Sequence, residues 1–228
     1  HDISFPSIQN ASVLFEQISF RLWESFDCIL NASRKSDSRF AGLIDHYRSR
    51  AKAPPFFFAA HELLVSSYVR GQPIDQCLCD LLLEFDEYSF FENLEILPFL
   101  RSAGLQEKIC HAVICSDVRR TYKDAIKNDL IPRPFKNDVG FDVSKRMMAE
   151  ALSLIRLADE ALFKETQFVV NEVRIFQSGN LRAGTTFNTL GMIYVGVFAS
   201  CDDLSRYIEH VVHESAHNLL YAHWMQDP

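Results

Sequence analysis

The pattern of apolar residues changes near residue 130, from helical spacing to β-branched and aromatic runs. This change constrains the fold more than any other feature. Before it, apolar residues recur at helical spacing in several segments, such as residues 12–30 and residues 56–69 after Pro54 and Pro55. After the turn-like stretch LIPRPFKNDVGFD, the β-branched and aromatic runs QFVVNEVRIFQ and TFNTLGMIYVGVF stand between two long helical patterns. The sequence therefore predicts an α+β fold with a mainly helical N-terminal half and a short antiparallel sheet packed beside a C-terminal helix.

The same change divides the chain into a helical region, residues 1–130, and an α+β region, residues 131–228. With 228 residues, 48% of them hydrophobic, the two regions are expected to form one compact unit. The chain starts without Met and stops a few residues after a strong helical pattern. We therefore expect it to be part of a longer polypeptide.

The net charge of −7 argues against nucleic acid and anionic membranes as main partners, because an acidic protein does not attract them. No apolar run reaches the roughly eighteen residues that a membrane-spanning helix needs, and the first residues lack the features of a secretory signal. The six cysteines are scattered without a C-x-x-C pair, which favours reduced thiols. These features predict a cytoplasmic protein and are compatible with a homodimer.

The last helical pattern carries the strongest chemical signal, the H-E-x-x-H motif of His213, Glu214 and His217. On a helix, histidines four residues apart project from one face, so both imidazoles can bind one metal ion. Ser200 and Asp203 resemble a capping box at the start of this helix. The stripe beside the motif that is expected to be buried consists of Leu204, Ile208, Val211, Val212, Ser215, Ala216 and Leu219. Two imidazoles and a carboxylate beside such a stripe are costly to bury unless something pairs with them. We therefore predict that His213 and His217 bind a metal ion.

Two histidines do not complete a catalytic site, because catalytic zinc and mononuclear non-haem iron commonly take three protein ligands. His223 stands six residues after His217, as in the pattern H-E-x-x-H-x-x-G-x-x-H. However, Leu220 replaces the glycine at which that chain leaves the helix, and residues six apart on a continuous helix point about 120° away from each other. We expect the third ligand to lie beyond Pro228 rather than at His223.

The other histidines give weaker signals. His61 and Glu62 begin a second partial motif, but Val65 occupies the place of its second histidine, so this segment is expected to be plain helix. His46 and His111 stand alone on helical patterns, and an isolated histidine is more often a hydrogen-bonded or surface residue than a ligand.

Residues 190–222, LGMIYVGVFASCDDLSRYIEHVVHESAHNLLYA, resemble the core of the HExxH-type 2-oxoglutarate-dependent peptide β-hydroxylases, a family also described as HEXXH-motif peptide-modification proteins. The likeness consists of a glycine that opens a strand of small and aliphatic residues (191–197), a short acidic link at Asp202 and Asp203, and a helix that reads V-H-E-x-A-H-N-L-L. A fainter match extends into the helical segments that precede it.

This resemblance implies that His213 and His217 bind Fe(II), and that 2-oxoglutarate is the co-substrate for hydroxylation of a β-carbon in a ribosomal peptide, as in natural product biosynthesis. Glu214 would then orient a ligand or substrate group. The distal carboxylate of the co-substrate requires a cation or hydroxyl groups. The candidates for this role are polar residues on the preceding strands: Arg174, Arg182, Thr185 and Tyr194. Members of the family continue past the end of the matching segment, which implies a third iron ligand after Pro228.

Two alternatives stay open. In a zinc metallopeptidase, Zn(II) would lower the pKa of a bound water, Glu214 would take its proton, and the strand GMIYVGVF would be an edge strand that pairs with the substrate backbone. In a non-catalytic peptide-binding protein, the motif would be a relic. The sequence H-N-L-L after the first part of the motif and the glycine-led strand before it favour the oxygenase.

Overall fold

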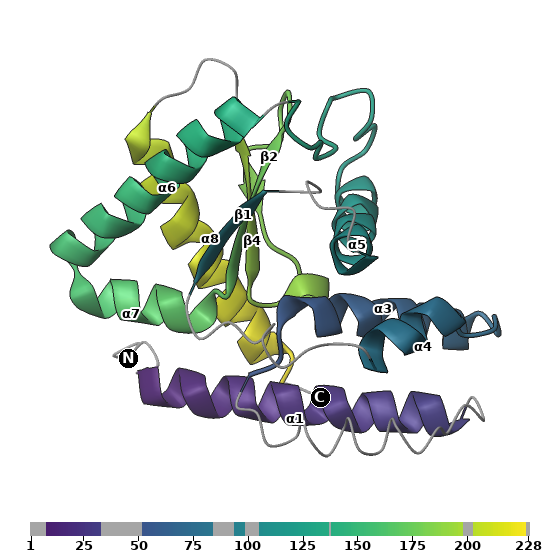
Figure 1. Cartoon of the computed structure of the whole chain (residues 1–228). Helices are drawn as coiled ribbons and strands as arrows, with labels where there is room; N and C mark the ends of the chain where they lie inside the picture. Colours follow the sequence, from purple (N-terminus) through teal and green to yellow (C-terminus); the bar gives the residue numbers. More distant parts are fainter. Residues whose placement is uncertain are drawn as a thin grey trace.

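The computed structural model describes residues 8–32, 52–83, 94–98, 105–136, 138–197 and 203–226 (Figure 1). The N-terminal half contributes α1 (Ile8–Ala32), α3 (Pro55–Val69), α4 (Gln76–Leu83), β1 (Glu95–Pro98) and α5 (Leu105–Thr121). The C-terminal half contributes α6 (Asp138–Ala158), α7 (Glu160–Val169), β2 (Glu172–Gln177), β3 (Ala183–Gly184), the 3₁₀ helix η2 (Phe187–Thr189), β4 (Met192–Val197) and α8 (Leu204–Trp224). The fold is α+β, with a mainly helical N-terminal half, as predicted.

The sheet is mixed rather than antiparallel, which corrects the prediction. Its strand order is β1-β2-β4-β3, with β1, β2 and β4 parallel and only β3 antiparallel to β4. The two predicted runs do not form a hairpin, because residues 178–191 between them first form β3 on the far side of β4 and then η2. The chain thus re-enters the sheet in the direction of β2. The almost unbroken apolar run of β4 is typical of a parallel strand that is buried on both faces.

The position of β4 corrects a second prediction. It lies inside the sheet, paired with β2 on one side and β3 on the other, so it is not an edge strand. Among the strands that the structure describes, β3 and β1 form the two edges. The strand β1 comes from the N-terminal half and pairs with β2 from Glu95 opposite Glu172 to Pro98 opposite Ile175.

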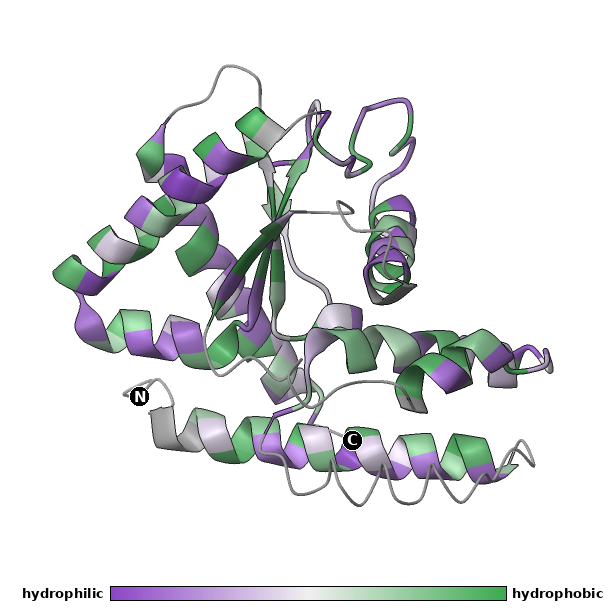
Figure 2. Ribbon diagram, viewed as in Figure 1, coloured by the Kyte–Doolittle hydropathy of each residue, from purple (hydrophilic) through white to green (hydrophobic). Residues whose placement is uncertain are grey.

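The helices cover both sides of the sheet. In Figure 1, α6, α7 and α8 lie on one side, α5 lies on the other, and α3 and α1 cross below them. Hydrophobic colour covers much of the central sheet, and the helices carry both hydrophobic and hydrophilic residues along their length (Figure 2). One continuous cluster of buried side chains includes Trp23 of α1, Phe57 of α3, Ile114 of α5, Met148 of α6 and Val195 of β4. Both halves of the chain therefore contribute to the same core.

Polar residues set the ends of several helices. The long helical pattern that begins near residue 143 is broken at Asp159, whose side chain accepts a hydrogen bond from the Leu162 amide (3.0 Å) and starts α7. At α8 the N-cap is Asp203, which accepts from the Ser205 amide (3.0 Å). Ser200, predicted to take part in this cap, lies outside the described residues.

No helix within the described ranges has the length and apolar character needed to cross a membrane.

Candidate metal centre

The helix α8 carries the H-E-x-x-H motif and packs against β4, α6 and η2. Its buried residues are Tyr207, Val211, Glu214, Ser215, Asn218, Leu219 and Ala222. This face is rotated from the predicted stripe, since Ala216 is exposed and Val212 is only half-buried. The rotation places Glu214 and Asn218 in the interior and leaves His213 and His217 on the accessible flank.

The two motif histidines meet at their ring nitrogens. The Nε2 atoms of His213 and His217 are 3.0 Å apart, and their ring centroids are 4.6 Å apart. Two ligands that bind one ion at about 2.0–2.1 Å, with about 90–109° between them, have nitrogen atoms about 2.8–3.4 Å apart. The imidazoles therefore have the spacing of two neighbouring ligands of one metal ion. A hydrogen bond between the two neutral rings gives the same spacing, so the geometry alone is consistent with both interactions.

A third ligand does not come from the described part of the chain, where no three His, Cys, Asp or Glu side chains converge as a metal site requires. The helix continues through Leu220 to Trp224, as predicted, so His223 stays on a regular helical turn. It is exposed, and its place six residues after His217 turns its side chain away from the pair. The donor set thus fits two of the three protein ligands that a catalytic Zn(II) or Fe(II) site takes.

Glu214 is a buried carboxylate beside the histidine pair. It is 7% exposed, and burial raises its pKa to about 7. None of the described residues donates a hydrogen bond to its side chain. Its charge contributes to the raised pKa of the Tyr194 and Tyr221 hydroxyl groups, after the larger effect of burial in each case. Glu214 can therefore exchange a proton near neutral pH, and its charge influences two tyrosine hydroxyl groups.

Asn218 joins the motif helix to the start of β4. Its side chain accepts a hydrogen bond from the Gly191 amide (2.8 Å) and donates to the carbonyls of Met192 (3.4 Å) and Glu214 (3.1 Å). Gly191 has a φ of +87°, a conformation that favours glycine, just where the chain enters the strand. The glycine-led strand and the asparagine after the second motif histidine thus have a joint structural role, which is to fix α8 relative to the sheet.

Arg174, one of the residues predicted to bind the co-substrate, points toward α5 and forms ion pairs with two carboxylates. Its guanidinium contacts Glu172 (2.7 Å) and Glu107 (3.1 Å) and donates to the Pro98 carbonyl (3.3 Å). Burial alone would lower the pKa of Arg174, but Glu172, Cys110 and Glu107 raise it overall. The side chain is only 12% exposed, so these contacts leave it little capacity for a further anion.

Thr185 and Tyr194 also have partners within the fold. The Thr185 hydroxyl donates to the Met192 carbonyl (2.8 Å) across β3 and β4. Tyr194 is buried, and its hydroxyl lies against Gly184, where a side-chain Cβ would come within 2.4 Å of it. The charge of Glu214 contributes to the raised pKa of the Tyr194 hydroxyl, after the larger effect of burial.

Arg182, the fourth predicted residue, lies close to the motif flank. Its side chain is exposed, and its charge lowers the pKa of His210 on α8. Burial is the main cause of that lowered pKa. The charge of Glu209 opposes it more strongly than Arg182 supports it, and His213 and Arg206 have smaller lowering effects. The Arg182 backbone is held at β4, because its carbonyl accepts a hydrogen bond from the Gly196 amide (2.6 Å). Arg206 and His210 were not predicted as site residues, although they share the helical stripe of His213 and His217 in the sequence.

An aromatic stack continues the stripe beyond His217. The ring of Tyr221 stacks on Phe187 of η2 with centroids 4.0 Å apart, and Trp224 stacks on Phe187 at 5.9 Å. The ring of His217 lies 5.9 Å from Tyr221, and Trp224 is 56% exposed. The flank of α8 thus passes from cationic groups, through the histidine pair, to an accessible aromatic surface.

The remaining histidines have structural partners. His61 on α3 shares a hydrogen bond with the Ser25 hydroxyl of α1 (2.7 Å), in agreement with the prediction of a plain helix. His111 contacts Cys115 Sγ (3.2 Å) and the Pro132 carbonyl (3.4 Å). His46 lies outside the described residues.

No protein-family model and no curated protein sequence matches the chain. The resemblance of residues 190–222 to the HExxH-type hydroxylases therefore stays a prediction from the motif residues themselves.

Proposed function

We propose that the protein is an Fe(II)- and 2-oxoglutarate-dependent hydroxylase of peptide side chains, acting in the cytoplasm. The observation that carries the metal-dependent part is the 3.0 Å approach of the His213 and His217 Nε2 atoms on the accessible flank of a helix anchored in the core. The choice of iron and 2-oxoglutarate rests on the resemblance of residues 190–222. When bound, Fe(II) with 2-oxoglutarate and O₂ would supply the oxidising equivalents, so that substrate C–H becomes C–OH while 2-oxoglutarate becomes succinate and CO₂.

In this proposal each residue of the motif has a distinct task. His213 and His217 would hold the metal through Nε2, and a third ligand would come from outside the described residues. Glu214, which is buried, would orient a polar group of the site rather than bind the metal. Asn218 would hold α8 in place against the start of β4, because its side chain accepts a hydrogen bond from the Gly191 amide.

The peptide would bind beside β3 and the aromatic stack. Strand β3 lies against α8 and forms one edge of the described sheet, so an extended peptide can add to it through backbone hydrogen bonds. The rings of Phe187, Tyr221 and Trp224 offer contact area for apolar side chains of that peptide.

The test uses the full-length polypeptide, reconstituted anaerobically with Fe(II) and then given 2-oxoglutarate, air and a peptide encoded beside its gene. We expect the peptide to gain one oxygen atom, measured by mass spectrometry, with release of one succinate per event. Zn(II) should inhibit by occupying the same histidines. Cleaved peptide that needs Zn(II) but not 2-oxoglutarate would overturn the oxygenase proposal.

A zinc metallopeptidase is the second candidate, and the state of Glu214 is the observation that favours it. A carboxylate with a pKa of about 7 next to a histidine pair suits a general base that takes a proton from water. Glu214→Gln separates the two functions. It should abolish cleavage in a peptidase but leave partial activity in a hydroxylase, in which His213→Ala removes more activity than Glu214→Gln.

A further inference from the structure

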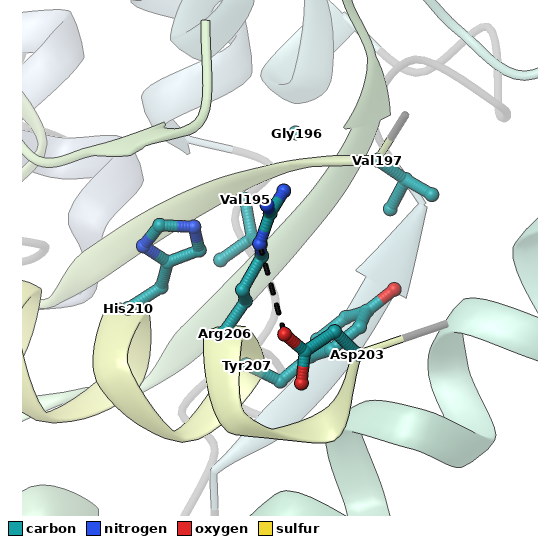
Figure 3. Close-up of a pocket in the computed structure, with 7 residues that line it drawn as sticks. All are labelled: Val195, Gly196, Val197, Asp203, Arg206, Tyr207 and His210. Carbon is teal, nitrogen blue, oxygen red and sulfur yellow. Dashed lines mark ion pairs between the residues drawn. The ribbon is translucent and has the colours of Figure 1, made fainter. Parts of the chain in front are cut away.

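The two ends of the α8 flank offer different surfaces to a ligand. On the N-terminal side of His213, a hollow opens between the end of β4 and the first turns of α8, and its lining includes Asp203, Arg206 and His210 (Figure 3). Acidic and basic side chains are mixed there, and Arg206 contacts Asp203 at 3.9 Å. On the C-terminal side of His217, aromatic rings follow instead. This second end therefore presents uncharged rings next to the histidine pair.

Three rings from two elements build this second surface. Phe187 of η2 stacks on Tyr221 with centroids 4.0 Å apart, and Trp224 lies 5.9 Å from Phe187 and 6.0 Å from Tyr221. Trp224 is 56% exposed, and Leu220, next to Tyr221 in sequence, is 40% exposed. None of the described lysines and arginines lies over any of the three rings. We call the accessible, uncharged surface of Phe187, Tyr221 and Trp224 the aromatic platform.

Asp117 of α5 holds η2 in the position that the platform requires. The Thr186 hydroxyl and the Asn188 side-chain amide (3.1 Å) both donate hydrogen bonds to the buried Asp117 carboxylate. Thr186 also caps η2, because its hydroxyl oxygen accepts from the Asn188 backbone amide (3.1 Å). These two residues flank Phe187 in sequence. With both of them fixed to α5, the Phe187 ring between them is held against α8.

We propose that Asp117 and Thr186 are positioning residues that preset the aromatic platform to bind an aromatic or large aliphatic side chain of the substrate peptide, and this assignment rests on the proposed function. Rings that are already fixed lose little conformational entropy when a ligand binds. The Tyr221 ring lies 5.9 Å from the His217 ring. Side chains on one face of an extended peptide are about 6–7 Å apart. The bound side chain is therefore expected about two residues from the one that is hydroxylated.

Binding of the peptide to the metal-free, full-length protein tests this proposal, because it needs no turnover. The probes are the peptide encoded beside the gene and its variants with each aromatic or large aliphatic residue changed to Ala in turn, all titrated by calorimetry. Phe187→Ala and Trp224→Ala remove rings of the platform. Thr186→Val removes the hydroxyl that donates to Asp117, and Thr186→Ser keeps it. The matched control is Thr166→Val on α7, a buried threonine whose hydroxyl has no hydrogen-bond partner among the described residues.

Phe187→Ala and Trp224→Ala should weaken peptide binding about tenfold or more. Thr186→Val and Asp117→Ala should each weaken it about threefold to tenfold, and the double variant no more than either, because both act through η2. Thr186→Ser and Thr166→Val should bind like the wild type. One Ala-substituted peptide should bind weakly to the wild type and lose nothing further in the platform variants. In turnover, Thr186→Val should raise KM for the peptide and change kcat little.

Unchanged peptide binding in Phe187→Ala and Trp224→Ala, or no peptide binding by the wild-type protein, overturns the platform. Losses in Thr186→Ser or Thr166→Val as large as in Thr186→Val overturn the positioning role, because they indicate a general loss of structure. Light scattering tests the other occupant, a second copy of the chain. A wild-type dimer that becomes monomeric in Trp224→Ala overturns the assignment of the platform to the peptide.

The outcome separates the platform from the proposed function. Peptide binding that both ring variants lose, in a protein that never hydroxylates the peptide, supports the platform and refutes the hydroxylase. Hydroxylation by Phe187→Ala and Trp224→Ala with an unchanged KM for the peptide supports the hydroxylase and refutes the platform.

Discussion

Buried charged side chains have partners on one side of the sheet and lack them on the other. On the α5 side, Arg174 lies between Glu172 and Glu107, and the Asp117 carboxylate of α5 receives hydrogen bonds from Thr186, Asn188 and Arg120. On the α8 side, Glu214 is equally buried, but none of the described residues donates a hydrogen bond to its side chain. The buried charged groups of the first region are paired with donors or with one another, whereas Glu214 in the second region has no such partner among the described residues.

This difference indicates which polar residues serve the fold and which serve a ligand. A buried carboxylate is stable when donors or cations compensate its lost hydration, and it is costly without them. The α5 side meets this condition from within the chain. On the α8 side, Glu214 has no such compensation from the described residues, which agrees with the proposal that this side binds a ligand. The pairing of charges thus separates two arginines, Arg174 and Arg182, that the sequence placed in one group.

The largest expected effect is on stability at Arg174. Arg174→Met leaves Glu172 and Glu107 buried without their cation, which should cost about 3–5 kcal/mol in the free energy of unfolding. Urea denaturation followed by circular dichroism measures it. Arg182→Met, on the other side of the sheet, should change stability by less than about 0.5 kcal/mol, because its side chain is exposed. Equal losses in the two variants would refute the contrast between the regions.

A smaller loss is expected at Asp117. Asp117→Ala removes the acceptor of the Thr186 hydroxyl and of the Asn188 amide, whose nitrogen lies 3.1 Å from Asp117 Oδ2. The cost should be about 2–3 kcal/mol, since buried donors are left without partners. The control is Asp142→Ala on the exposed side of α6. A loss below about 0.5 kcal/mol at Asp117 would show that this network does not stabilise the fold.

The effect at Glu214 should be smaller and of opposite sign. Its pKa is about 7 in the folded chain and near 4.5 without the fold, so the folded state holds a proton that the unfolded state releases. Stability of the metal-free protein should therefore fall as the pH rises from about 4.5 to about 7. At pH 8, Glu214→Gln should be more stable than the wild type by about 1–2 kcal/mol.

Denaturation of the metal-free protein at pH 8 and at pH 4.5 measures this effect, and the gain should largely disappear at the lower pH. Glu209→Gln, an exposed position on the same helix, is the control and should show little change at either pH. A Glu214→Gln variant that is no more stable than wild type at pH 8 would mean that Glu214 has a compensating partner.

The sequence predicted the motif helix and its continuation through Leu220 because helical periodicity is a local property. It did not predict the sheet order, since strand direction depends on the path of residues 178–191, which carry no periodic pattern. It also missed β1, which has only four residues and ends at Pro98. The ion pairs of Arg174 could not be predicted either, because they also depend on contacts between distant parts of the chain. Its partner Glu107 is 67 residues away in the chain, so only the folded structure brings them together.

The central claim is that His213 and His217 together bind one metal ion, and metal content tests it most directly. The full-length protein is reconstituted anaerobically with Fe(II), freed of excess metal and analysed by elemental mass spectrometry, alongside His213→Ala, His217→Ala and, as control, the exposed His223→Ala. We predict one metal ion per chain in the wild type and in His223→Ala, and loss of most of it in the other two variants, with the helical circular dichroism signal of all four proteins unchanged. Full retention of metal in both His213→Ala and His217→Ala would contradict the claim.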